Sequence, residues 1–73
     1  MKEKVILYLL AISLYLGIYK GHVALLEHDR TTPVTVYPYP VSIFTEKDQR
    51  LLTEGIEIKT EAEVTKHLDD FLS

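Results

Sequence analysis

The sequence has no cysteine and no tryptophan, and it has only three glycines and three prolines among its 73 residues. Without cysteine the chain forms no disulfide and offers no thiolate to a metal ion, although this alone does not fix the compartment. The glycines, Gly17, Gly21 and Gly55, are too scattered for a phosphate-binding loop. The chain also lacks an excess of basic residues, because its formal net charge is -3. Nucleic acid is therefore not an expected partner, since its phosphates require a basic patch.

The length limits the chain to one domain, and below roughly 70–80 residues a single core rarely supplies more than about 3–5 kcal/mol. A substrate cleft with walls and a lid is therefore not expected. The acidic residues gather in the last part, where 46–73 holds eight carboxylates against four cations. This surplus favours attraction to a basic protein surface, although carboxylates on amphipathic helices more often form a solvated face.

The beginning of the chain is its most hydrophobic part. Val5 to Tyr19 carries no charge and follows two lysines, Lys2 and Lys4. As a helix these residues would span about 23 Å, against about 30 Å for the hydrocarbon core of a bilayer. We predict a hydrophobic N-terminal segment over residues 1–14 that is a membrane anchor or an uncleaved signal, with a cytoplasmic N-terminus. The alternative is an apolar helix or strand in the core of a soluble protein.

A second interpretation applies to the end of this apolar run. Leu16 and Ile18 alternate with tyrosine and glycine, and another strand-like run follows Lys20-Gly21. A two-residue turn there predicts a hairpin of about Tyr15–Tyr19 and His22–Glu27. A strand that begins near Leu14 leaves too few residues for a full membrane crossing, so the two interpretations compete.

A third strand is expected near Val34–Tyr37, after a polar loop of turn-forming residues. Pro38 and Pro40 follow it, and residues two apart in a strand direct their backbone nitrogens to the same side. Both missing N–H donors therefore fall on one edge, which predicts that this strand ends at the margin of the sheet.

The last thirty residues predict two capped helices, over Glu46–Glu54 and Glu61–Leu72, with a short extended run at Ile56–Ile58 between them. Thr45 is a candidate N-cap of the first helix, and a glycine follows its end. Thr60 has a glutamate three residues later, the pattern of a capping box.

Together these elements predict an α+β fold, with a small three-stranded antiparallel sheet, two C-terminal helices on one face and an apolar N-terminal helix or anchor. The folded domain is expected over 15–73. Its predicted core joins residues of the helices to residues of the sheet: Leu51, Leu52, Val64, Leu68 and Phe71 against Leu16, Ile18, Val23, Leu25, Val34 and Val36.

Candidate chemical groups are few and lack the spacing that catalysis or metal binding needs. The three histidines, His22, His28 and His67, form no H-x-x-x-H pair. The three serines, Ser13, Ser42 and Ser73, lack the sequence around an activated nucleophile. We therefore assign no catalytic, cofactor-binding or metal-binding residue, and we expect no enzyme activity and no cofactor.

Several segments in this order resemble the C-terminal domain of the BofC (bypass-of-forespore C) family. The resemblance covers roughly 15–73 and is carried by Tyr19 to Leu25, Val34 to Val36, Phe44 to Asp48 with Leu52, Gly55 and Ile56, Thr60 to Val64, and Leu68 to Ser73. These are structural motifs and include no catalytic signature. Here the apolar lead stands where the family has an N-terminal domain.

The resemblance implies a non-catalytic, membrane-tethered regulatory module outside the cytoplasm that binds protein. BofC restrains a signalling serine peptidase during sporulation, so an extracytoplasmic peptidase is the partner that the resemblance implies. The expected location is the cell membrane, with a single N-terminal anchor and an extracytoplasmic C-terminal domain. The alternative is a soluble structural or oligomerising protein of the cytoplasm, whose apolar N-terminus packs into a second copy.

Overall fold

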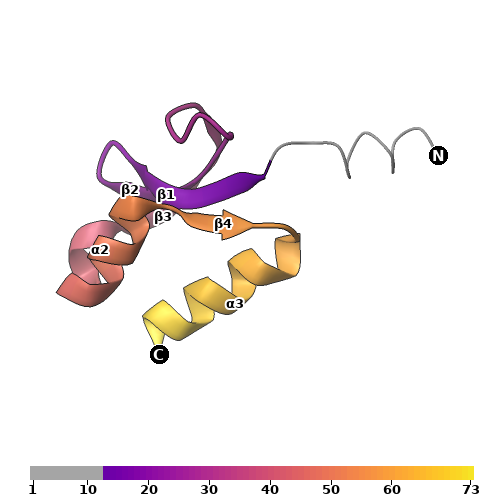
Figure 1. Ribbon diagram of the computed structural model, residues 1–73. Helices are drawn as coiled ribbons and strands as arrows, with labels where there is room; N and C mark the ends of the chain where they lie inside the picture. Colours follow the sequence, from indigo (N-terminus) through magenta and orange to yellow (C-terminus); the bar gives the residue numbers. More distant parts are fainter. Residues whose placement is uncertain (1–12) are drawn as a thin grey trace, which may run out of the picture.

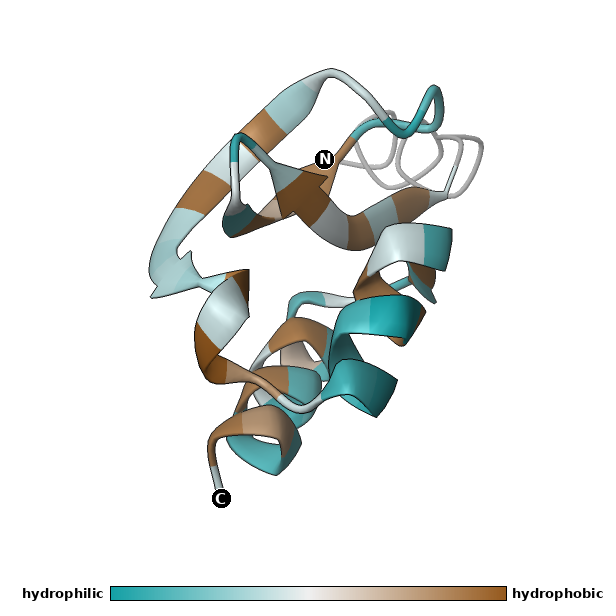
Figure 2. Ribbon diagram, turned by 90° about the vertical axis from the view of Figure 1, so that its left-hand side faces the viewer, coloured by the Kyte–Doolittle hydropathy of each residue, from teal (hydrophilic) through white to brown (hydrophobic). Residues whose placement is uncertain are grey.

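The computed structural model describes residues 13–73, whose arrangement is shown in Figure 1. The elements follow in the order β1 (Leu14–Tyr19), β2 (His22–Leu26), β3 (Pro33–Pro40), the 3-10 helix η1 (Val41–Ile43), α2 (Glu46–Glu54), β4 (Ile56–Ile58) and α3 (Glu61–Leu72). The strands form one antiparallel sheet in the order β3-β2-β1-β4. Figure 2 shows α2 and α3 on the same side of this sheet. The expected α+β class is confirmed, with both helices at their predicted bounds.

The predicted N-terminal anchor, residues 1–14, lies outside the described residues except for Ser13 and Leu14. Leu14 begins β1, so the strand interpretation of the end of the apolar run is confirmed and a helix continuing to Tyr19 is wrong. Within residues 13–73, neither helix has the length and apolar character that crossing a bilayer requires.

The hairpin of β1 and β2 turns at Lys20-Gly21, as predicted. Lys20 has φ 50° and Gly21 has φ 81°, the two positive values that a type I′ turn needs. This turn sets the register Tyr19↔His22, and it brings Leu16 opposite Leu25 on the face that carries the core.

The expected three-stranded sheet is wrong, because β4 adds a fourth strand. Ile56 pairs with Leu16 and Ile58 with Leu14, so the short extended run closes the outer edge of the first half of β1. Three residues are too few for their pattern to show which strand they pair with, and the sequence therefore predicted only the extended run.

The two helix starts differ in how their backbone N–H groups are satisfied. The Thr45 hydroxyl accepts a hydrogen bond from the backbone N–H of Asp48 at 3.2 Å, so the predicted cap of α2 is confirmed. Thr60 makes no such side-chain bond, and that part of the capping-box prediction is wrong. The Glu63 carboxylate instead accepts from the backbone N–H of Lys59 at 3.2 Å, one residue before the expected donor.

The core lies between the sheet and the helices. Five predicted members are buried, namely Leu16, Val23, Leu25, Leu52 and Val64, while Ile18, Leu68 and Phe71 are half-buried. The prediction missed Ala24, Leu26, Phe44 and Ile58.

Three residues were wrongly placed in the core. Val34 is 50% exposed and Val36 47%, because no further strand or helix of residues 13–73 covers that part of β3. Leu51 is 40% exposed, because adjacent helical residues point about 100° apart and Leu52 takes the buried position.

Candidate functional site

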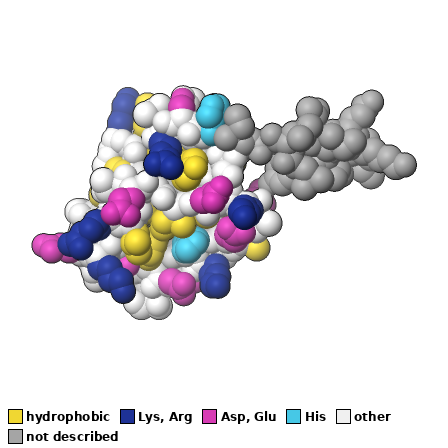
Figure 3. Space-filling view, viewed as in Figure 1, with side chains coloured by type: hydrophobic (Ala, Val, Ile, Leu, Met, Phe, Trp, Pro, Cys, Tyr) yellow, Lys and Arg dark blue, Asp and Glu magenta, His cyan; other side chains and the backbone are white. Residues whose placement is uncertain are grey.

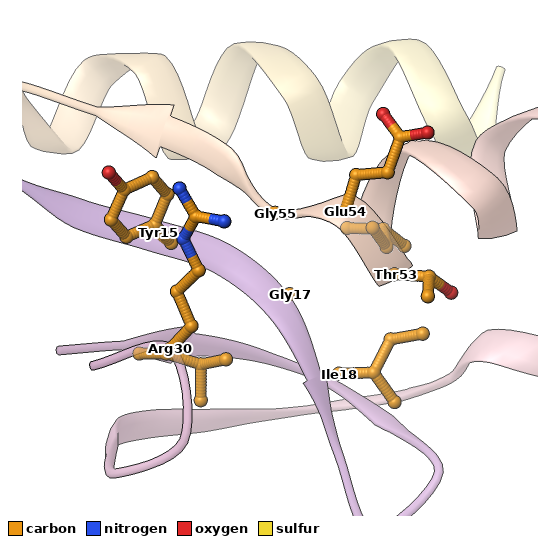
Figure 4. Close-up of a pocket in the computed structure, with 9 residues that line it drawn as sticks. Tyr15, Gly17, Ile18, Arg30, Thr53, Glu54 and Gly55 are labelled. Carbon is orange, nitrogen blue, oxygen red and sulfur yellow. The ribbon is translucent and has the colours of Figure 1, made fainter. Parts of the chain in front are cut away.

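A pocket of about 320 Å³ lies between β1, the C-terminal end of α2 and the loop that joins β2 to β3. Figure 4 shows Arg30 reaching from its loop to lie beside Tyr15, with Thr53 and Glu54 contributed by α2. The lining combines apolar, aromatic and charged residues: Tyr15, Gly17, Ile18, Leu26, Arg30, Leu52, Thr53, Glu54 and Gly55.

The Arg30 guanidinium stacks on the Tyr15 ring, with its central carbon 4.3 Å from the ring centroid. Such a cation–π contact is worth about 0.5–1 kcal/mol at an exposed site. The guanidinium carries N–H donors and no acceptor. The side chain thus offers a positive charge and several donors at the pocket wall.

Arg30 has φ 63°, a left-handed backbone conformation that costs a non-glycine residue about 1–2 kcal/mol. The loop that imposes it is closed by two backbone hydrogen bonds of 2.8 Å. The N–H of Glu27 donates to the carbonyl of Thr32, and the N–H of Arg30 donates to the carbonyl of Glu27. The conformation of the loop therefore fixes where the Arg30 side chain starts.

The Asp29 side chain stabilises the same loop through hydrogen bonds to the residues that follow it. Its carboxylate accepts hydrogen bonds from the Thr32 hydroxyl and from the backbone N–H groups of Thr32 and Thr31, the last two at 2.9 and 2.8 Å. Donation to the charged form, most strongly from the Thr32 hydroxyl, holds the pKa of the Asp29 carboxyl well below its usual range. The loop is ordered by local hydrogen bonds, although its residues are exposed.

Two glycines make room for the pocket. A Cβ atom at Gly17 would lie 2.9 Å from Cδ1 of Leu26 and 3.4 Å from the backbone carbonyl oxygen of Leu52. Gly55 ends α2 with φ 91°, and a Cβ atom there would lie 3.6 Å from Cδ1 of Tyr15. The chain therefore passes close to the pocket at both positions without a side chain.

The wall opposite Arg30 is the C-terminal end of α2. The last carbonyl groups of a helix carry partial negative charge, and α2 has no basic residue in its last turn. Cδ of Arg30 is 3.8 Å from the position that a Cβ would take at Gly55, so Arg30 supplies a cation near this helix end. The pocket therefore presents an apolar floor with charges of both signs at its rim, an arrangement suited to binding.

The histidines and serines considered from the sequence are not brought together. His22 lies 3.3 Å from the Lys20 carbonyl through Nδ1, and the His67 ring is 6.2 Å from that of Phe71. The Ser13 hydroxyl donates to Glu57, and the Ser73 hydroxyl donates to the Asp70 carbonyl at 3.0 Å. Among residues 13–73 no three histidine, aspartate or glutamate side chains gather as a metal-binding group.

A second feature lies along β3, where Tyr37 and Tyr39 pack against the core. Burial raises the pKa of the Tyr37 hydroxyl, and the negative charge of Glu61 raises it further. The start of α3 therefore places a carboxylate where its charge acts on the Tyr37 hydroxyl of the edge strand.

Sequence reasoning missed the residues that form the pocket. It treated Arg30 as part of a polar loop, Tyr15 as a strand residue and Gly17 as an isolated glycine. One signal was available, because an aspartate two residues before a threonine favours a side-chain-stabilised turn. That signal predicts an ordered loop, but it does not reveal that the loop meets the end of α2. Comparison with protein-family models, with curated proteins and with solved structures gave no match to this chain.

Proposed function

We propose that this chain is a non-catalytic interaction module that is held at the outer face of the cell membrane and regulates another protein there. The observation that carries the proposal is the pocket at which Arg30 is stacked on Tyr15 beside Gly17 and Gly55. Its ordered loop and glycine-lined floor suit the reception of a side chain from a partner.

The tether in this proposal is the apolar run that precedes the domain. Val5 to Ser13 carries no charge, and β1 begins at the next residue. A domain that begins so soon after its anchor stays close to the membrane surface. As a helix, these nine residues span about 14 Å against about 30 Å for the hydrocarbon core, so in this proposal they anchor the domain at the membrane interface and do not form a complete span.

The partner in this proposal is an extracytoplasmic peptidase, of the kind that the resemblance to the BofC C-terminal domain implies. A sporulation role belongs to the same proposal. The acidic residues of 46–73 do not form a uniform docking face, since Figure 3 shows basic side chains among the acidic ones on the side of α2 and α3. The pocket is therefore the better-defined docking feature.

Membrane fractionation of the full chain, with a C-terminal reporter that matures only outside the cytoplasm, tests the location. We expect the protein to sediment with membranes and the reporter to be active. A soluble protein with an inactive reporter would contradict the tether and the peptidase partner together, and would favour the cytoplasmic oligomerising alternative.

Site-specific photo-crosslinking tests the pocket. A photoreactive amino acid replaces Thr53, which is exposed at the pocket, or Thr65, an exposed helical threonine that does not line it. We expect a crosslinked partner from position 53 and a much weaker product from position 65. Equal yields from the two positions would show that the pocket does not determine the contact.

A further inference from the structure

All three prolines of the chain lie on β3, which is an outer strand of the sheet. This strand has eight residues, so it would offer a long unpaired edge to another strand. Proline has no N–H group, and its position relative to the free edge decides what that edge can bind.

The register shows which backbone groups face outward. The tight turn makes Tyr19↔His22 a hydrogen-bonded pair, and hydrogen-bonded pairs alternate along an antiparallel ladder. His22 and Ala24 therefore direct their backbone groups toward β1. Their partners on β3 are Pro40 and Val36, whose backbone groups must then face away from β2.

Pro38 stands between these two residues, where the register shifts because four positions of β3 span two of β2. Its exposed position between the half-buried Tyr37 and Tyr39 places it on the same face as Val36 and Pro40. The free edge from 36 to 40 thus presents three outward carbonyl oxygens, those of Val36, Pro38 and Pro40. It presents a single N–H donor, that of Val36. The bond from the N–H of Val41 to the Gly21 carbonyl, at 2.9 Å, agrees with this alternation, because Val41 faces inward.

An edge of this kind suits a partner that donates hydrogen bonds and needs none in return. An added β-strand requires donors and acceptors in alternation, and Pro38 and Pro40 remove two of the donors. Arginine and lysine side chains carry N–H donors and no acceptor. They match a row of carbonyl groups better than a strand does.

The surroundings also favour a cation. The half-buried rings of Tyr37 and Tyr39 lie on the same strand, and Glu61 at the start of α3 is close enough to act on the Tyr37 hydroxyl. Aromatic rings attract cations, and the net charge of -3 attracts a basic partner over longer distances.

We propose that the free edge of β3 binds arginine or lysine side chains from a basic segment of a partner protein and does not accept a further β-strand. The inference rests on the proposed function only in taking the partner to be a protein. It concerns a different surface from the pocket, so its failure would leave the crosslinking result at Thr53 unaffected.

The test uses the full chain with carbonyl 13C labels, kept in a neutral detergent, and a tetra-arginine peptide as the probe. The control peptide carries citrulline, a neutral analogue, in place of arginine. We expect the arginine peptide to shift the carbonyl signals of Val36, Pro38 and Pro40, with several-fold weaker binding of the control. Shifts confined to the acidic helices, or equal binding of the two peptides, would overturn the proposal.

A matched pair of variants tests the charge near the edge. Glu61 and Glu46 both lie in the first turn of a helix, but Glu61 is the one that acts on Tyr37. We expect Glu61→Gln to weaken peptide binding about two- to fivefold, the usual range for an exposed ion pair, and Glu46→Gln to change it less. Equal effects would overturn the placement of the cation beside β3.

The double variant Pro38→Ala with Pro40→Ala restores both missing donors. We expect it to self-associate more strongly than the original chain in sedimentation experiments, because its edge then suits strand pairing. A circular dichroism spectrum checks that the variant is folded. Unchanged sedimentation of a folded double variant would contradict the outward direction of these residues and overturn the proposal.

Discussion

The two outer edges of the sheet are protected from further strand pairing in different ways. β3 is eight residues long and its Val34 and Val36 side chains are about half-exposed, but prolines remove donors from its free edge. β4 has only three residues, and its Ile58 is 4% exposed beneath α3. One edge is protected by backbone chemistry and the other by shortness and packing. Substitutions on the β4 side should therefore affect stability, and those on β3 should affect association.

The largest effect should follow from Ile58→Ala. Loss of a buried isoleucine side chain costs about 2–5 kcal/mol, which is comparable to the whole stability of so small a domain. The matched change at the other edge, Val36→Ala, should cost less than about 1 kcal/mol because that side chain is half-exposed. Urea unfolding followed by circular dichroism measures both. Equal losses of stability in the two variants would show that the β3 and β4 edges do not differ in their contribution to stability.

A smaller loss of stability is expected for Gly17→Ala, at the position of β1 where the backbone of α2 comes close. The new methyl group meets Leu26 at 2.9 Å and should cost about 1–3 kcal/mol. Leu26→Ala should partly relieve this clash, so the double variant should lose less stability than the sum of the two single losses. Strict additivity in the same unfolding experiment would show that the two side chains do not compete for space.

Substitution of Arg30 should change the free energy of unfolding less than substitution of Ile58 or Gly17. Two variants separate its contact with Tyr15 from the strain of its positive φ. Arg30→Ala removes the contact with Tyr15 but keeps a side chain at positive φ, so we expect a loss of about 0.5–1 kcal/mol. Arg30→Gly removes the same contact and also relieves the backbone strain, so it should be close to neutral. Thermal unfolding compares the two variants. If Arg30→Gly were more destabilising than Arg30→Ala, the positive φ of residue 30 would not strain the backbone of this loop.

The smallest effect should appear as a pH dependence of the loop. The pKa of Asp29 is lower in the folded chain than in the unfolded chain, so its contribution is fully present above the unfolded value of about 4. It is lost as the pH falls below that value toward the folded pKa. Urea unfolding of the original chain and of Asp29→Asn should therefore differ by a constant amount above about pH 5, and by less in acid. A difference that grew in acid would have the wrong sign for this hydrogen-bonded carboxylate.

The sequence predicted those parts of the fold that depend on neighbouring residues. The helix bounds, the cap at Thr45 and the turn at Lys20-Gly21 follow from local conformational preferences, and the edge position of β3 followed from its prolines. It did not predict the partner of β4, because pairing with β1 joins segments about forty positions apart. The core error at Val34 and Val36 has the same origin, since alternation shows which side chains share a face but not whether anything covers it.

The pocket was not predictable for a related reason. Tyr15, Arg30 and Gly55 come from three separate parts of the chain and meet only after the sheet and α2 are in place. Each residue has an ordinary local role as a strand, loop or helix-end residue. The pocket arises from their contact, which no short sequence motif records.

The pairing of β4 with a strand about forty positions earlier in the sequence affects the order in which the protein folds. β1 and β2 close through a two-residue turn, whereas Leu16 and Ile56 must meet across about forty residues, and the entropic cost of closing a loop grows with its length. Local hairpins form faster than such distant pairings. During synthesis from the N-terminus, β1 is made early, and about forty further residues must follow before the strand that covers its outer edge is complete. The interval before β4 arrives is when the domain is most exposed to aggregation and to proteolysis.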